Sequence, residues 1–215
     1  MKKKVLVFDL WGTIVETGVK PSPSRQIKYF LRVRESFSDF VLAFEHSFMT
    51  RKFESLKQGF EHVVKDFNLR IPDFVYEKMI GMWNKNVILS EMYEDVKPVL
   101  EELRKKKYKT VLLANIDQFA YEQLEHKHQL SELFDAVYPS FETGLLKINS
   151  ESFEKIAKDL KVEKEEILMI GDSVHSDMEA AEKAGIQGLL LDRKDNREYD
   201  NKILLLTELE EQLKK

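Results

Sequence analysis

Three aspartates follow apolar segments of the kind that form buried strands. Asp9 comes directly after the segment 5–8 (VLVF), and Asp172 and Asp177 come shortly after the segment 167–170 (ILMI). Parallel strands end at one edge of their sheet, where ligands bind, so we expect the three carboxylates to converge. Three such charges repel one another, and a hard divalent cation with oxygen ligands would stabilise them. The aspartates therefore predict a metal site, and Mg²⁺ is the cation that we expect.

Lys147 is the basic residue that we expect beside these carboxylates. It lies in a loop with Gly144, between a predicted strand at 136–138 and a predicted helix at 151–160. This places it on the strand-end side of the sheet, where its ammonium could balance the aspartates and bind a phosphate. A lysine taken alone is more often a solvated surface charge, and a lone aspartate is often a helix cap or a turn residue. The prediction depends on the whole set.

The segments that must position these residues alternate between strand and helix. Apolar, β-rich runs predict strands at 5–8, 110–114, 136–138, 167–170 and 188–191. Amphipathic patterns predict helices at 96–107, 119–128, 151–160 and 177–184, the last beginning at or near Asp177. The alternation indicates an α/β protein with a doubly wound, Rossmann-like parallel sheet.

Residues 21–90 interrupt this alternation with amphipathic helical runs rich in Phe, Leu and Lys. Pro21 and Pro23 mark the entrance, and Pro72 is expected to start a new helix. An insertion directly after the first strand lies over the strand ends, where it could cover a site and control entry to it. We therefore predict a core domain of residues 1–20 and 91–215 and an inserted all-helical domain of residues 21–90.

The combination of these motifs resembles the haloacid dehalogenase superfamily of hydrolases. The resemblance rests on the segment 8–13 (FDLWGT), on Lys147 and on the segment 171–177 (GDSVHSD), which together span most of the chain. It implies that the helical insertion is a cap over the site. It also implies a phosphoryl-transfer enzyme, a small-molecule substrate, expected to be a phosphate ester, and Mg²⁺ as the cofactor.

The resemblance implies a role for each matching residue. Asp9 would attack the substrate and form an aspartyl ester, and Lys147 would steady the charges. The metal ligands would be Asp9, the backbone carbonyl of Trp11 and Asp172, with Asp177 supporting the metal shell. The substrate's phosphate would be held by the residues Gly12, Thr13, Ala114, Asn115 and Lys147.

Two positions depart from the family's pattern. Phosphatases of this family typically carry a second aspartate two residues after the nucleophile, and here that residue is Trp11, whose indole cannot act as an acid or base near neutral pH. Ala114 stands where the family usually has a Ser or Thr whose hydroxyl binds phosphate, although the backbone N–H of Asn115 could still donate. Candidates by residue type alone for the missing acid or base are Glu16, His46, His62 and His175.

Three hypotheses follow. The first, which we favour, is an Mg²⁺-dependent phosphatase acting on a small phosphorylated metabolite. The second is a 2-haloacid dehalogenase, because halide leaves without a proton and Trp11 is then no handicap, although such chemistry has no need of Asp172. The third is a catalytically weak module that binds metal and phosphate. If Arg25, Arg32 or Arg34 points into the cleft, the substrate should carry a second anionic group.

The composition of the chain restricts the partners that it is expected to bind and the cellular compartment in which we expect it. The 215 residues carry 34 Lys and Arg against 38 Asp and Glu, a net charge of -4, which gives no general positive field for nucleic acid. The chain has no cysteine, which excludes disulfides and thiolate chemistry. No apolar run has the length of a signal-peptide core or a membrane span. We expect a cytoplasmic protein without nucleic-acid or membrane partners.

Overall fold

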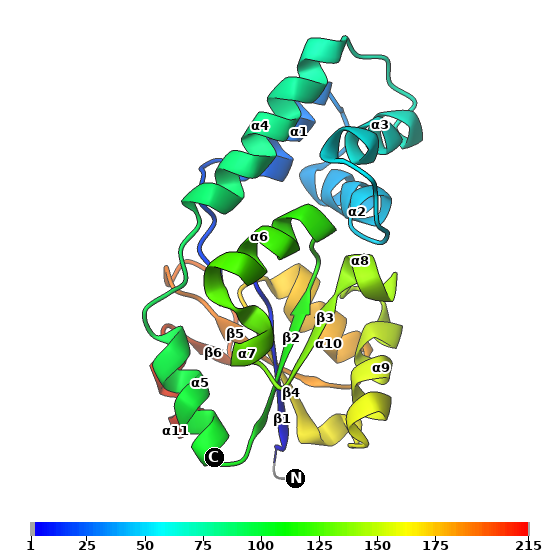
Figure 1. Ribbon diagram of the computed structural model, residues 1–215. Helices are drawn as coiled ribbons and strands as arrows, with labels where there is room; N and C mark the ends of the chain where they lie inside the picture. Colours follow the sequence, from blue (N-terminus) through cyan, green and yellow to red (C-terminus); the bar gives the residue numbers. More distant parts are fainter. Residues whose placement is uncertain (1–2, 215) are drawn as a thin grey trace.

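The computed structural model describes residues 3–214 and has a six-stranded sheet at its centre (Figure 1). All neighbouring strands run parallel, in the order β3-β2-β1-β4-β5-β6. The strands are β1 (Val5–Phe8), β2 (Lys109–Ala114), β3 (Ala136–Pro139), β4 (Ile167–Gly171), β5 (Gln187–Leu191) and β6 (Lys202–Ile203). The predicted doubly wound α/β fold is confirmed.

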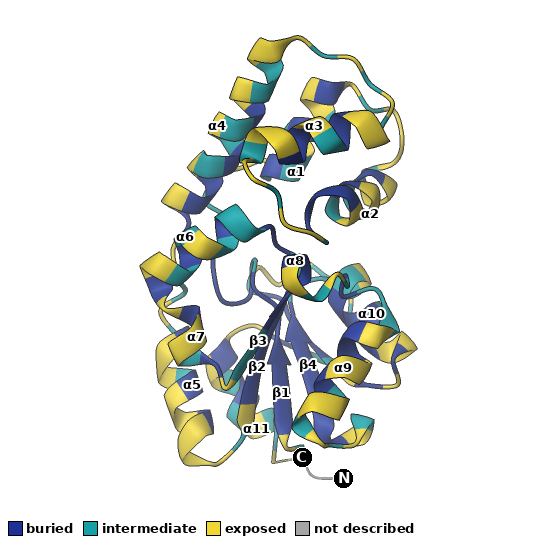
Figure 2. Cartoon of the chain, turned by 45° about the vertical axis from the view of Figure 1, so that its right-hand side comes forward, coloured by how far each residue is buried: buried dark blue, intermediate teal, exposed yellow. Residues whose placement is uncertain are grey.

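Alternate strand residues feed two hydrophobic cores, one on each face of the sheet. In β1, Leu6 and Phe8 pack on one face and Val5 and Val7 on the other, and all four are fully buried. The first face is covered by α5 (Val96–Lys105), α6 (Gln118–His128), α7 (Leu130–Leu133) and α11 (Leu209–Gln212). The second is covered by α9 (Ser150–Leu160) and α10 (Glu179–Lys183). Burial on both faces explains why the strands, dark blue in Figure 2, are almost wholly apolar.

Four helices form what we call the helical unit: α1 (Pro23–Leu31), α2 (Phe37–Phe48), α3 (Leu56–Asp66) and α4 (Asp73–Leu89). Figure 1 shows this unit beyond the carboxyl ends of the strands. It has its own core, in which the largest buried side chains are Phe40, Phe44, Phe48, Phe60, Met79 and Trp83. Helix α4 begins directly after Pro72, as predicted. The domain boundaries at 20/21 and 90/91 stay a prediction.

Short helices complete the chain and account for one departure from the predicted elements. They are α8 (Ser140–Thr143), η1 (Lys164–Glu166), η2 (Val174–Met178) and η3 (Leu206–Glu208). Asp177 lies inside η2, a π-helical turn, and α10 starts only at Glu179. The turn widens because the Ser173 carbonyl accepts the N–H of Met178 at 3.2 Å, while the Asp177 carboxylate folds back to accept the Ser173 N–H at 3.0 Å.

Two further observations concern the periphery of the fold. Strand β6 was not predicted, because it has only two residues, Lys202 and Ile203, in a polar segment. Within residues 3–214, no helix has the length and apolarity needed to cross a membrane.

Candidate active site

The three aspartates singled out from the sequence come together at the carboxyl ends of β1 and β4. One carboxylate oxygen from each of Asp9, Asp172 and Asp177 lies within 4.8 Å of the others. Asp9 and Asp177 are buried and Asp172 is partly buried. The two strands are adjacent and parallel, which is why residues 163 positions apart in the chain become neighbours.

Lys147 lies among these carboxylates and is buried with them. Its ammonium pairs with Asp9 Oδ1 and, at 2.5 Å, with Asp177 Oδ1. Burial alone would lower the pKa of Lys147, but the two carboxylates outweigh it and the pKa lies above its ordinary value. Lys147 is therefore a permanent cation that connects the loops after β1, β3 and β4.

One ammonium does not balance three carboxylates. Burial raises the pKa of Asp9 to about 7; the Lys147 charge opposes this rise, and the charges of Asp177 and Asp172 add to it. Burial and Asp177 also raise the pKa of Asp172, against the Arg197 guanidinium that donates to Asp172 Oδ2 at 3.1 Å. Converging carboxylates that destabilise one another's charge are a donor set that fits a hard cation such as Mg²⁺.

The loop after β1 is shaped to lie against this cluster. Gly12 has φ +81°, and a Cβ at this position would lie 2.5 Å from Asp172 Oδ2, so a side chain would disturb the carboxylate. Thr13 is fully buried and its hydroxyl donates to Asp9 Oδ2 at 3.4 Å. Both residues thus lie against the carboxylate cluster, and their expected role in holding a phosphate stays a prediction. The metal role expected for the Trp11 carbonyl stays a prediction.

Asn115 connects the cluster to the helical unit. It follows Ala114, the buried last residue of β2, and its Oδ1 accepts the Lys147 backbone N–H at 2.9 Å. Its Nδ2 donates at 2.7 Å to Oε2 of Glu45, a partly buried residue of α2. Burial raises the pKa of Glu45 to about 7; the charge of Lys147 and the Asn115 hydrogen bond oppose this rise, and Asp177 adds to it. A carboxylate of the helical unit therefore lies beside the cluster.

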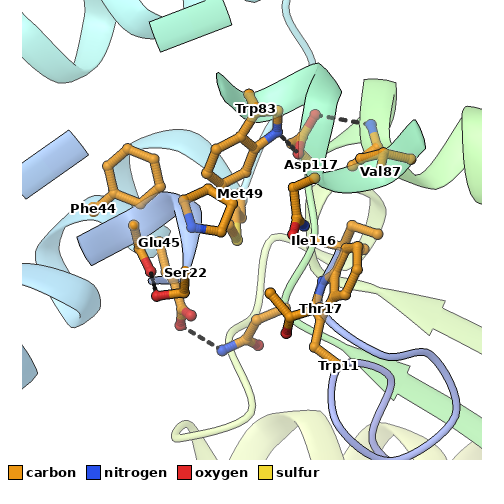
Figure 3. Close-up of a pocket in the computed structure, with 15 residues that line it drawn as sticks. Trp11, Thr17, Ser22, Phe44, Glu45, Met49, Trp83, Val87, Ile116 and Asp117 are labelled. Carbon is orange, nitrogen blue, oxygen red and sulfur yellow. Dashed lines mark hydrogen bonds between the residues drawn. The ribbon is translucent and has the colours of Figure 1, made fainter. Parts of the chain in front are cut away.

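A cavity of about 180 Å³ lies between the core and the helical unit (Figure 3). Trp11 lines it from the loop after β1, Glu45 from α2 and Trp83 from α4. The Trp83 indole N–H donates at 2.8 Å to Oδ2 of Asp117, which also lines the cavity. Burial raises the pKa of Asp117 to about 6, against hydrogen bonds from the Ala120 N–H and the indole. Within the described residues the lining includes no Lys, Arg or His.

The candidates that sequence reasoning offered for the missing acid or base lie elsewhere. His46, His175 and Glu16 are exposed, and His62 lies 3.5 Å from Asp66 on α3. None of the four lines the cavity beside Trp11. Glu16 instead lines another pocket, together with Gly12 and Asp172. A catalytic role for any of the four stays a prediction.

The arginines considered as partners of a second anionic group also lie away from the cavity. Arg25, Arg32 and Arg34 are absent from its lining, and the Arg25 guanidinium stacks over the Phe37 ring at 4.1 Å. The expectation attached to them, a substrate with a second anion, therefore has no support from these residues.

Comparison with known proteins identifies the family. The family model described as haloacid dehalogenase-like hydrolase matches residues 3–185. This chain belongs to the haloacid dehalogenase-like hydrolases. The resemblance of its motifs to that family is thereby confirmed, and the protein is an enzyme of the hydrolase class.

Relatives of this haloacid dehalogenase-like hydrolase include enzymes with different reactions. The glyceraldehyde 3-phosphate phosphatase of Pyrococcus furiosus is 23% identical over 188 residues, which cover 86% of this chain and 78% of the relative. The HAD-hydrolase YfnB of Bacillus subtilis, solved bound to magnesium, matches with a TM-score of 0.65 and 16% identity, over 99% of each chain. The L-2-haloacid dehalogenase of Xanthobacter autotrophicus matches with a TM-score of 0.67 and 17% identity, over 99% of this chain and 98% of that one. The shared fold alone does not distinguish phosphatase from dehalogenase.

Residues near the site that sequence reasoning missed are Glu45, Asp117, Arg193 and Arg197. Asp117 lies two residues before the helix predicted at 119–128 and is the N-cap of α6, where it accepts the N–H of Phe119 at 3.0 Å, so the N-cap pattern could have found it. Arg193 donates to the Thr13 carbonyl at 2.9 Å from the loop after β5. Nothing in the sequence around Arg193 indicates this contact, because it depends on β5 lying beside β4 in the sheet.

Proposed function

We propose that this hydrolase is an Mg²⁺-dependent phosphatase that cleaves a small phosphate monoester through a phosphoaspartate at Asp9. The observation that carries the proposal is the convergence of Asp9, Asp172 and Asp177 around the Lys147 ammonium. A carboxylate nucleophile, two further acidic groups and one buried cation suit a substrate that is itself an anion with oxygen ligands. The phosphatase from Pyrococcus furiosus supports the same substrate class.

The chain's own residues would perform the phosphoryl transfer. A carboxylate oxygen of Asp9 attacks phosphorus and the bond to the ester oxygen breaks, which leaves the phosphoryl group on Asp9. Lys147 favours the charged form of Asp9 and would offset the negative charge of the transferring group. Thr13, whose hydroxyl bonds to Asp9, and the backbone N–H of Asn115 would donate to phosphate oxygens, since Ala114 offers no hydroxyl.

Mg²⁺ would be held by Asp9 and Asp172, with Asp177 and the Trp11 carbonyl in support. When bound, it supplies positive charge that neutralises phosphate oxygens and lets one anion approach another. Asp177 accepts from Lys147 and from the Ser173 N–H, so its first task in this chain is to fix the position of Lys147.

The cavity favours a substrate whose organic part carries no charge. Its lining offers two carboxylates, Glu45 and Asp117, and within residues 3–214 no cation. Asn86 also lines it, is buried, and has an Oδ1 atom without a hydrogen-bond partner, so a hydroxyl on the substrate would find an acceptor there. The aromatic rings of Trp11, Phe44 and Trp83 supply apolar contact.

The test is phosphate release from p-nitrophenyl phosphate, with Mg²⁺ and with a chelator. We expect hydrolysis that requires Mg²⁺ and that falls by roughly 10⁴-fold or more in Asp9→Asn, because an amide cannot form the phosphoaspartate. Hydrolysis that persists in Asp9→Asn would contradict the proposal. Exposed Asp73, at the start of α4, provides the matched control: Asp73→Asn should retain activity.

The same preparation separates the other two hypotheses. Halide release from 2-chloropropionate in the presence of chelator would favour a dehalogenase, which needs no proton donor at position 11. Binding of Mg²⁺ and phosphate without hydrolysis, and without phosphorylation of Asp9, would favour a binding module.

A further inference from the structure

We propose that Glu45 of the helical unit is the general acid and base of this enzyme, in place of the aspartate that Trp11 replaces. The inference rests on the proposed phosphatase reaction and deepens it. It also makes α2 part of the catalytic machinery, whereas the core motifs place every expected catalytic group on the strand-end loops.

The first observation that supports this role is the location of Glu45. Glu45 and Trp11 line the same cavity, one from α2 and one from the loop after β1 (Figure 3). A side chain two residues after Asp9 faces this cavity, so the leaving group that a phosphatase must protonate would lie there. Glu45 faces the same space from the opposite side and carries the carboxyl group that the indole of Trp11 lacks.

The second support is the way Glu45 is held. Its Oε2 accepts the Asn115 Nδ2–H at 2.7 Å, and Asn115 Oδ1 accepts the Lys147 N–H at 2.9 Å. Asn115 therefore connects Glu45 to the residue that pairs with Asp9. Among the described residues, this is the hydrogen bond that holds the Glu45 carboxylate, and it occupies one oxygen, so the other can carry the proton that is exchanged.

The third support is electrostatic. The charged groups that face Glu45 are Lys147 and Asp177 from the core, with Asp117 on another wall of the cavity, bonded to Trp83. Burial outweighs the attraction of Lys147 and raises the pKa of Glu45 to about 7. A carboxyl group with this pKa is present in both protonation states at neutral pH, as a group that alternately gives and takes a proton must be.

The two half-reactions balance. In the first, Asp9 bonds to phosphorus, the bond from phosphorus to the ester oxygen breaks, and that oxygen takes the proton of the Glu45 carboxyl and leaves as an alcohol. In the second, the Glu45 carboxylate takes a proton from water as the water oxygen bonds to phosphorus. The bond from phosphorus to Asp9 then breaks, which releases phosphate, free Asp9 and protonated Glu45.

The test compares Glu45→Gln with the wild-type enzyme in Mg²⁺ on two substrates, glycerol 2-phosphate and p-nitrophenyl phosphate. The amide introduced by this substitution can still accept from Asn115 but cannot exchange a proton. We expect kcat/KM for glycerol 2-phosphate to fall by roughly 10²–10⁴-fold, and that for p-nitrophenyl phosphate by much less, because nitrophenolate leaves without a proton. With the aryl ester, a burst of about one equivalent of nitrophenolate should precede slow turnover, because water attack has lost its base.

Two further measurements separate catalysis from a structural role. The wild-type kcat/KM for glycerol 2-phosphate should fall as the pH rises through about 7, where Glu45 loses its proton, and this limb should be absent in Glu45→Gln. Adding Trp11→Asp to the Glu45→Gln variant should raise its kcat/KM for glycerol 2-phosphate at least about tenfold, whereas Trp11→Asp alone should change the wild-type value little. The control Glu61→Gln makes the same change on exposed α3 and should leave both substrates unaffected.

Three other results of these experiments would each overturn either the role of Glu45 or the proposed function. Glycerol 2-phosphate turnover in Glu45→Gln within about threefold of wild type would overturn the role of Glu45 while leaving the phosphatase intact. An equal loss on both substrates with a raised KM and no burst would also overturn it, because Glu45 would then only hold the helical unit against Asn115. A wild-type enzyme that neither hydrolyses nor becomes phosphorylated would overturn the proposed function itself.

Discussion

The two walls of the site differ in the charged groups that they carry. The wall formed by the core has three carboxylates on segments that follow the adjacent strands β1 and β4, and the buried ammonium of Lys147 from the loop between β3 and α9. The wall formed by the helical unit has aromatic rings and Glu45. The cavity that these side chains line is bounded on the core side by Trp11, Asn115 and Asp117, not by the carboxylate cluster itself, and its lining includes no cation within residues 3–214. The core wall suits a doubly charged phosphate and a metal ion, and the helical wall suits an uncharged alcohol and the transfer of a proton.

The two walls are joined by hydrogen bonds that cross the cavity's edge. Glu45 accepts from Asn115, the Trp83 indole donates to Asp117, and the Phe53 N–H donates to Gln118 Oε1 at 3.1 Å. The helical unit is thus attached at the site itself. Any movement of the unit would bring or remove the proposed acid and base together with the cavity wall.

The largest stability effect is expected in the core wall, from Lys147→Met. The change leaves Asp9 and Asp177 buried without their shared cation, so we expect the free energy of unfolding in chelator to fall by about 3–5 kcal/mol. Urea titration measures it, and added Mg²⁺ should recover part of the loss. Lys155→Met, which breaks an exposed pair with Asp159, is the control and should change little. A loss as small as that of the control would mean that the core wall does not depend on Lys147.

A smaller effect is expected at Asp117, and it depends on pH. Burial gives Asp117 a pKa of about 6 in the folded protein, above the value of about 3.9 in an unfolded chain, so the folded state binds its proton more tightly. The stabilisation that the folded state gains from this tighter proton binding is complete below about pH 4 and is lost as the pH rises through 6. The free energy of unfolding should fall by roughly 3 kcal/mol at most as a result.

Urea unfolding between about pH 4 and 7 tests this difference. Asp117→Asn should reduce the fall in the free energy of unfolding over that range. The lost hydrogen bond from Trp83 lowers this free energy by the same amount at every pH, so it does not affect the slope. Asn keeps an oxygen to accept the N–H of Phe119 and Ala120 at the start of α6. An unchanged slope would show that Asp117 does not titrate in this range.

The smallest effect concerns Arg197, which donates to Asp172 Oδ2 and so competes with a cation for that oxygen. The pair is partly exposed and contributes little to stability. Arg197→Gln should raise Mg²⁺ affinity roughly fivefold, about 1 kcal/mol, measured by calorimetry. Lys194→Gln removes the same charge from the same loop as a control, and an equal rise there would assign the effect to general charge alone.

The core wall could be predicted from the sequence because its physics is local. Four consecutive apolar residues before Asp9 and before Gly171-Asp172 indicate buried parallel strands, and parallel strands end at a common edge. The predicted strands agree with β1 to β5 within one residue at each end. The prediction places Asp177 at the start of a helix near the edge, whereas it lies inside the π-helical turn η2, where its ion pair with Lys147 and its bond to the Ser173 N–H fix its position.

The helical wall could not be predicted in the same way. Glu45 follows Phe44 on the flank of an aromatic stripe on α2, where a carboxylate normally faces water. Its contact with Asn115, 70 residues away, depends on how the helical unit sits on the core, which helical periodicity does not encode. Hydrophobic patterns revealed the helices of the unit but not which polar side chain reaches the site.

The most direct test of the account is rapid quenching of the enzyme during turnover of a ³²P-labelled phosphate ester in Mg²⁺, followed by peptide mapping. We expect acid-stable label on the peptide that contains Asp9, at higher occupancy in Glu45→Gln than in the wild type, and none in Asp9→Asn. Turnover of the ester without label at Asp9, or label that survives in Asp9→Asn, would contradict the account.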